Sequence, residues 1–169
     1  MRLLKTLFSA ATVSTVLLVG IFSTSEVKAD KTNYVRARDK CFDVSSKKGW
    51  QYFDLGTNYN GISITGGWTV DSRNYATVGP QGHNEPGLEP YNQYKYDKNL
   101  PFGALLVDIP TDSHGYIWVR GFQKLPKQIS QTAIRINDSD NSLGDNSGVL
   151  TVCFHDLIEQ VNPYDRNQD

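Results

Sequence analysis

The feature that most limits how this chain can fold is a series of short segments in which apolar and polar residues alternate, separated by turns rich in Gly, Pro and Asn. The segments cover residues 34–44, 50–55, 62–70, 103–109, 116–122, 131–137 and 149–155. Alternation with a period of two is typical of half-buried strands. No amphipathic segment exceeds two helical turns, and a short helix is expected only at 156–161. The pattern predicts an all-β protein, a β-sandwich or jelly roll.

The N-terminus has the pattern of a secretory signal peptide. Arg2 and Lys5 precede an apolar run that ends near Phe22, and Val27-Lys28-Ala29 places small residues at the two positions that a signal peptidase reads. We expect cleavage after Ala29, with residues 1–29 as the signal peptide and residues 30–169 as one domain. A retained membrane anchor is the alternative, although Ser and Thr residues interrupt the run. The protein is therefore expected to be secreted or periplasmic.

The charge of the chain argues against two classes of partner. Removal of residues 1–29 takes away three basic residues and one acidic residue, which changes the net charge from −1 to −3. No basic run remains to bind nucleic acid or an anionic membrane. Neither partner is expected.

The chain has two cysteines, Cys41 and Cys153, near the two ends of the mature domain. In an exported protein an even number of cysteines predicts a disulfide. Two buried free thiols are the alternative. Neither cysteine has a His or Cys neighbour at the spacing of a zinc site.

Residues 137–146 form a polar segment between two expected strands. The segment contains three carboxylates and three amides and no soft ligand. Oxygen-only ligand sets suit a hard divalent cation, above all calcium. A turn without a metal is the alternative, since Asn, Asp, Ser and Gly are common in turns. An EF-hand does not fit, because Leu143 stands where that loop needs Gly and Val149 stands where it needs Glu. Asn137-Asp138-Ser139 is also a glycosylation sequon.

Residues 72–101 form a long irregular segment that contains Tyr91, Tyr94 and Tyr96. A long loop in a small domain is either functional or disordered. Tyrosine rings on such a loop can stack on a ligand or pack beneath the loop.

Motifs for catalysis are missing from the sequence. There is no G-x-S-x-G elbow, and His83, His114 and His155 lack H-E-x-x-H spacing. His155 is expected to be structural, and the chain is not expected to be an enzyme.

Five short motifs occur in an order that resembles a known family. Gly67-Trp68 is followed by Gly79-Pro80-Gln81-Gly82, Phe102-Gly103-Ala104-Leu105, Asn137-Asp138 and Gly144-Asp145-Asn146-Ser147-Gly148. This order and spacing resemble the PA-I type galactophilic bacterial lectins over roughly residues 50–154. The resemblance implies a galactose-binding-like jelly-roll β-sandwich with one calcium ion at the sheet end, to which two galactose hydroxyls bind.

The resemblance also implies roles for particular residues. Asp138 stands where the family has the aspartate that binds both ion and sugar, and Asn146 stands at a side-chain ligand. Ser142 stands where a main-chain carbonyl is supplied, and a further carbonyl comes from Val70 or Asp71. Asp145 replaces an Asn that binds the ion and the sugar.

The remaining sugar contacts are less defined, because the family's His and Gln after G-P-Q-G have no direct match. His83 and Glu85 are the nearest residues, and Tyr91 or Tyr94 is expected to stack on the sugar. Together these features predict an exported calcium-dependent lectin for galactose-type glycans, open to assembly as a homo-oligomer. A calcium-stabilised structural or protein-interaction module without sugar binding is the alternative. An exported glycan-active enzyme or toxin subunit on the same fold is a third class.

Overall fold

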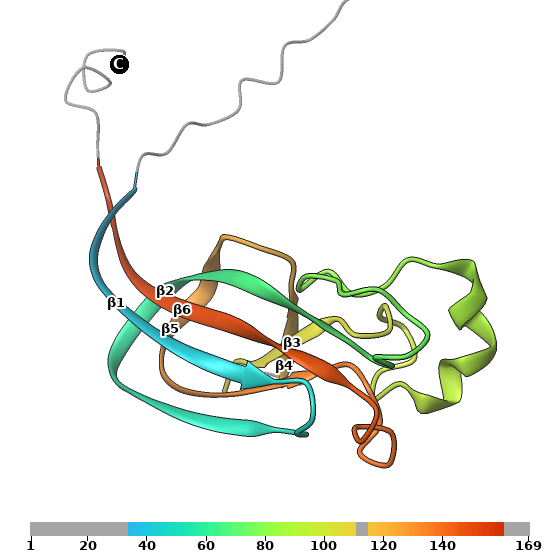
Figure 1. Ribbon diagram of the computed structural model, residues 1–169. Coiled ribbons are helices and arrows are strands. Elements are labelled where there is room, and N and C mark those ends of the chain that lie inside the picture. Colours follow the sequence, from blue (N-terminus) through green and yellow to red (C-terminus); the bar gives the residue numbers. More distant parts are fainter. Residues whose placement is uncertain (1–33, 111–114, 161–169) are drawn as a thin grey trace, which may run out of the picture. The chain divides into compact units, whose positions relative to one another are not determined.

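The computed structural model describes residues 34–110 and 115–160, so the expected signal peptide lies outside the described residues. The strands are β1 (Tyr34–Ser45), β2 (Gln51–Thr69), β3 (Leu105–Asp108), β4 (Tyr116–Val119), β5 (Gln123–Ile136) and β6 (Ser147–Glu159). A 3-10 helix, η1 (Pro86–Tyr94), lies in the long segment between β2 and β3 (Figure 1). The predicted all-β class is confirmed.

The strands form one antiparallel sheet in the order β1-β6-β2-β5-β3-β4. Strand β2 joins its two halves: residues 51–62 pair with β5, and residues 61–69 pair with β6. The pairing shifts register around Gly56, which has a φ of 75° that only glycine adopts easily. The sheet is therefore bent into a sandwich-like arrangement in which one strand serves both layers.

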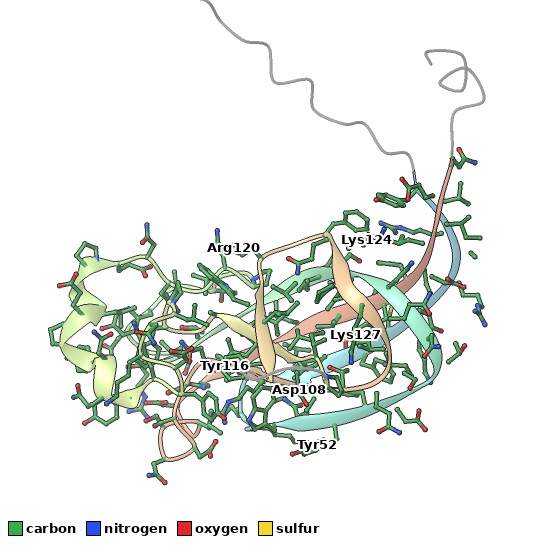
Figure 2. All side chains as sticks on the ribbon, turned by 180° about the vertical axis from the view of Figure 1, so that it is seen from behind. Tyr52, Asp108, Tyr116, Arg120, Lys124 and Lys127 are labelled. Carbon is green, nitrogen blue, oxygen red and sulfur yellow. A yellow bond between two sulfur atoms is a disulfide. The ribbon has the colours of Figure 1, made fainter. Side chains whose placement is uncertain are left out.

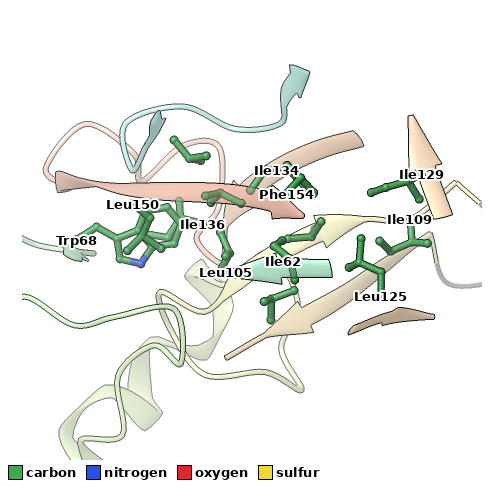
Figure 3. Packing of buried hydrophobic residues seen from close by; sticks show 14 of the residues in the cluster. Ile62, Trp68, Leu105, Ile109, Leu125, Ile129, Ile134, Ile136, Leu150 and Phe154 are labelled. Carbon is green, nitrogen blue, oxygen red and sulfur yellow. The ribbon is translucent and has the colours of Figure 1, made fainter. Parts of the chain in front are cut away.

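The core lies between these two halves of the sheet. Ile62, Leu150 and Phe154 from the β1-β6-β2 side pack in one cluster with Leu105 and Ile134 from the β5-β3-β4 side (Figure 3). All five side chains are 0 % exposed. Alternate residues of a strand point to opposite faces, which is why the period-two pattern identified most of these segments.

Trp68 closes the core at the end of the sheet that carries the long loops. The ring is fully buried, and its Nε1 donates a hydrogen bond to the Gly103 carbonyl at 2.7 Å. The Trp68 main chain also exchanges hydrogen bonds with Val78. Trp68 thus fixes the start of the irregular segment 70–104 against the core.

The two cysteines form the predicted disulfide. Cys41 and Cys153 face each other across β1 and β6, with Cα atoms 4.0 Å apart. They lie on the outer face, since the adjacent residues Phe42 and Val152 pack on the core side.

Some boundaries differ from the sequence-based expectation. The segments at 50–55 and 62–70 are parts of the single strand β2, because the residues between them continue in the sheet despite its bend. Strand β5 begins at Gln123, earlier than expected, since its exposed polar residues hid the pattern. The helix expected at 156–161 is wrong, because β6 continues to Glu159 through its pairing with β1.

Candidate functional site

The irregular segment 72–101 is tied to the end of β5 by Asn137. Its Nδ2 donates to the carbonyls of Asp97, Leu100 and Pro101, and its Oδ1 accepts the Asp97 N–H at 2.7 Å. The Asn137 side chain is fully buried. Its four hydrogen bonds hold the two loop regions that carry the predicted site residues in one place.

Three buried oxygen atoms in the loop between β5 and β6 have no hydrogen-bond donor among the described residues. They are both carboxylate oxygens of Asp138 and the Oδ1 of Asn146. Both side chains are 0 % exposed, and the Asn146 Nδ2 is committed to the Ser46 carbonyl at 3.0 Å. A buried polar atom without a partner is costly, and carboxylate and amide oxygens of this kind are ligands for a hard cation.

The environment of Asp138 disfavours its negative charge. Burial raises the pKa of its carboxyl group to about 6, and the nearby carboxylate of Asp145 adds to this shift. Asn146, the Ser139 N–H and Arg135 oppose it by lowering the pKa. None of these donors reaches an Asp138 oxygen in hydrogen-bond geometry. The charge therefore lacks a direct partner.

Arg135 is the buried cation closest to this loop, yet it does not pair with the Asp138 carboxylate. Its guanidinium donates to the main-chain carbonyl of Asp138 and to Oδ1 of Asp140 at 2.9 Å. The other side of the guanidinium rests on the Tyr96 ring, with 3.9 Å from Cζ to the ring centroid. Arg135 thus fixes the main chain of the loop and leaves the carboxylate free.

A cavity of about 620 Å³ lies beside this loop and gathers most of the residues predicted from the sequence. Its lining includes Asp71, Ser142, Asp145, Tyr91 and Tyr94, together with Val70, Asn74, Tyr75, Leu88, Phe102 and Asn141. Asp138 and Asn146 are buried next to Asp145 and are not part of the lining. The structure therefore brings together seven of the nine predicted site residues.

At the end of the cavity that follows β2, the main-chain carbonyls of Val70 and Asp71 differ in their hydrogen bonds. The Asp71 carbonyl accepts the Tyr75 N–H at 3.0 Å and the Thr69 hydroxyl at 3.3 Å. No donor to the Val70 carbonyl is found among the described residues. The Asp71 side chain is also engaged: a hydrogen bond from the Asn74 side chain, helped by the Arg73 N–H, lowers the pKa of Asp71. Val70 is thus the freer carbonyl.

Two tyrosines of η1 provide the aromatic wall of the cavity. Tyr91 and Tyr94 are 46 % and 45 % exposed, and their ring centroids are 6.4 Å apart. The Tyr94 carbonyl accepts the Ser139 N–H at 2.6 Å, which attaches η1 to the Asp138 loop. These rings are therefore held beside the acidic residues with their faces accessible.

His83 and Glu85 lie outside this cavity. They line a neighbouring cavity of about 330 Å³ that shares only Leu88 and Phe102 with the first. The His83 ring is buried, with its Nδ1 3.1 Å from Glu85 Oε2 and its Nε2 without a partner among the described residues. A direct contact of His83 with a ligand in the first cavity is not supported by this placement.

A third cavity, of about 320 Å³, was not expected from the sequence. Trp50, Tyr52, Tyr96, Tyr116 and Asp108 contribute to its lining, and Figure 2 shows Tyr52, Asp108 and Tyr116 near one another. Burial, together with its hydrogen bond to Asp97, raises the pKa of Tyr116 to about 12. These residues come from four separate segments of the chain, so no local sequence motif could have predicted the cavity.

Two further findings limit what the described part of the chain can bind or span. Within residues 34–110 and 115–160, no three His, Cys, Asp or Glu side chains cluster as a metal site would require. A cation near Asp138 would thus depend on amide and main-chain oxygens as well as carboxylates. In the same ranges no helix has the length and apolar character to span a membrane.

Comparisons with known proteins give matches among solved structures alone. No protein-family model matches the sequence, and no curated protein matches it. Among solved structures, the chain is similar to one described as "EclA N-terminal domain; PllA-like lectin". The TM-score is 0.44 at 17 % identity, over 73 % of this chain and 98 % of that chain. A likeness at this level carries no argument about function, and membership of the PA-I type lectins stays a prediction.

Proposed function

We propose that this protein is an exported calcium-dependent carbohydrate-binding protein. The observation that carries the proposal is the set of three buried, unpaired oxygen atoms on Asp138 and Asn146 next to an open cavity with an acidic and an aromatic wall. These oxygens need a hydrogen-bond donor or a cation, and no residue that the structure describes provides one in contact.

The donor chemistry fits calcium. Calcium takes six to eight oxygen ligands from carboxylates, amides, main-chain carbonyls and water. Asp138, Asn146 and Asp145 would supply side-chain oxygens, and the carbonyls of Ser142 and of Val70 or Asp71 would supply main-chain oxygens. A cation held in this way would offset the charge of Asp138, whose burial disfavours ionisation.

The cavity fits a sugar as the second ligand. A calcium ion with open coordination positions accepts adjacent hydroxyl groups as hard donors. Asp145 lines the cavity and can accept a hydrogen bond from a hydroxyl group, although it cannot donate one. Tyr91 and Tyr94 offer exposed ring faces for the apolar side of a pyranose. Galactose-type sugars are the proposed ligands, on the strength of the sequence resemblance.

Thermal unfolding with calcium and with a chelator tests the ion. We expect calcium to raise the melting temperature, because a ligand that binds only the native state stabilises it. The Asp138→Ala protein should lose this response, whereas the exposed Asp54→Ala control should keep it. Equal melting temperatures of the parent protein in the two conditions would reject the calcium site.

Titration calorimetry with monosaccharides at saturating calcium tests the sugar. Galactosides should bind, and the heat should vanish when the calcium is chelated. A filled calcium site with no binding of any diol sugar would leave the alternative, a calcium-stabilised structural or protein-interaction module.

A further inference from the structure

We propose that Ser63 is an activated nucleophile that is acylated by small esters, with His155 as its general base and Asp39 as the residue that positions His155. This site lies on the outer face of the sheet, and none of its three residues lines the cavity described above. The proposal is independent of the calcium-dependent function.

Strand pairing brings the three residues together from distant parts of the sequence. In β1 and β6, Asp39 lies directly opposite His155. In β2 and β6, Ser63 lies opposite Cys153, two residues from His155 on the same face. Residues that are opposite or diagonal across antiparallel strands can touch when one side chain is long. The sheet thus places carboxylate, imidazole and hydroxyl in one row.

The hydrogen bonds have the connectivity of a Ser-His-Asp triad. His155 Nδ1 is 2.6 Å from Asp39 Oδ1, and His155 Nε2 is 2.7 Å from the Ser63 Oγ. An ionised carboxylate can only accept, so the imidazole hydrogen belongs on Nδ1. In the neutral ring Nε2 then accepts the Ser63 hydroxyl proton, which is the arrangement that activates a serine.

The surroundings set the accessibility and the size of the substrate. His155 is 1 % exposed, whereas Ser63 is half-buried. The Phe122 ring lies 6.1 Å from the His155 ring, and the Cys41–Cys153 disulfide lies beside Ser63 on the same face. The nearby aromatic ring and disulfide would limit the acyl group to a small size.

The reaction balances as ordinary ester hydrolysis. The Ser63 Oγ forms a bond to the ester carbonyl carbon while its proton moves to His155 Nε2. The carbon–oxygen bond to the alcohol then breaks, and the alcohol leaves with that proton. Water releases the acid from Ser63 in the same way. Asp39 touches no reacting atom and acts through the orientation of His155.

The reaction is expected to be slow, because the site lies within a paired part of the sheet. Ser63 and Cys153 belong to the β2–β6 ladder, so their main-chain groups do not form a separate oxyanion hole. Loss of one such donor lowers the rate of known enzymes by about 10²–10³-fold. Covalent labelling of the serine is therefore a better measurement than turnover.

The test is labelling of the full mature protein with a fluorophosphonate, followed by peptide mass spectrometry. The Ser63 Oγ forms a bond to phosphorus and fluoride leaves, so an adduct on Ser63 is expected. Ser63→Ala should abolish the adduct, while Ser130→Ala, which changes an exposed serine of β5, should leave it unchanged. His155→Gln should lower the labelling rate about 10²- to 10⁴-fold, the range typical of a lost general base.

The test of Asp39 must distinguish the positioning of His155 from a general loss of structure. Asp39→Asn should slow the labelling at an unchanged melting temperature, and Asp39→Glu should restore part of the rate. No adduct on Ser63, under conditions in which a known serine hydrolase reacts fully, would overturn the proposal. Equal labelling of a folded His155→Gln protein would overturn it as well.

Discussion

Asp138→Asn should make the metal-free protein more stable at neutral pH while it abolishes the response to calcium. The two side chains have nearly the same shape, so the substitution removes the charge with little change in packing. The new amide can also donate to the Asn146 Oδ1, which has no partner among the described residues.

The magnitude follows from the pKa of Asp138. Its carboxyl group has a pKa of about 6 in the folded protein, against 3.8 for the ordinary carboxyl. Between these pH values the native state binds more protons than the unfolded chain, so the free energy of unfolding falls as the pH rises. At 1.36 kcal/mol per pKa unit the loss reaches about 3 kcal/mol at pH 7. This corresponds to roughly 10 °C in melting temperature for a domain of this size.

Thermal unfolding in chelator at pH 4 and at pH 7 measures this difference. The parent and Asp138→Asn proteins should melt alike at pH 4, and the variant should melt higher at pH 7. Asp140→Asn is the matched control, because the Asp140 side chain of the same loop is 70 % exposed and the Oδ1 of an amide can still accept the hydrogen bond from Arg135. A variant that is less stable than the parent at pH 7 in chelator would refute the reasoning.

Three further outcomes are expected. Replacement of Cys41 and Cys153 by serine should lower the free energy of unfolding by about 5 kcal/mol in the chain-entropy model, since the disulfide closes a loop with a sequence separation of 112 residues. Denaturant unfolding measures this loss, and an unchanged midpoint would contradict the prediction. Tyr94→Ala should weaken sugar binding about fivefold, because the contact with the ring contributes about 1 kcal/mol. Calorimetry should show an unchanged calcium affinity, and a parallel loss of calcium affinity would argue against a stacking role. Gly148→Ala at the start of β6 should cost about 1–3 kcal/mol, because Gly148 has a φ of 97° and a Cβ would lie 2.4 Å from the Gly67 carbonyl oxygen. Gly144→Ala in the preceding loop meets no atom within 4 Å and should change the unfolding midpoint little.

The sequence was sufficient for the parts of the fold that depend on local pattern. Period-two alternation identified most of the strands, and two cysteines in a chain expected to be exported predicted the disulfide. The lengths of β2 and β5 could not be read in this way, because bends and exposed polar residues interrupt the alternation while the main-chain pairing continues. The extension of β6 past Asp156 likewise depends on its pairing with β1.

Those parts of the candidate site that have an unusual local composition were predictable from the sequence. The oxygen-rich loop and the tyrosines of the long segment pointed to residues that the structure places at one cavity, Asp145 and Tyr94 among them. Burial was not predictable, and it is burial that leaves Asp138 without a partner. The row formed by Ser63, His155 and Asp39 was missed because sequence separations of 92 and 116 residues hide a contact that only strand pairing creates.

The position of Arg135 links the fluorescence of Trp50 to the loop that contains Asp138. Its guanidinium lies 5.6 Å from the centroid of the Trp50 ring and donates to the main chain of Asp138. Indole emission responds to nearby charge, so a shift of the Asp138 loop on ion binding would change the fluorescence of Trp50 through this arginine. The other two tryptophans have no such link to the loop among the described contacts: Trp68 is buried against Gly103, and Trp118 lies against Arg120 and Pro80. A calcium titration followed by tryptophan emission would therefore report on the loop without any added label.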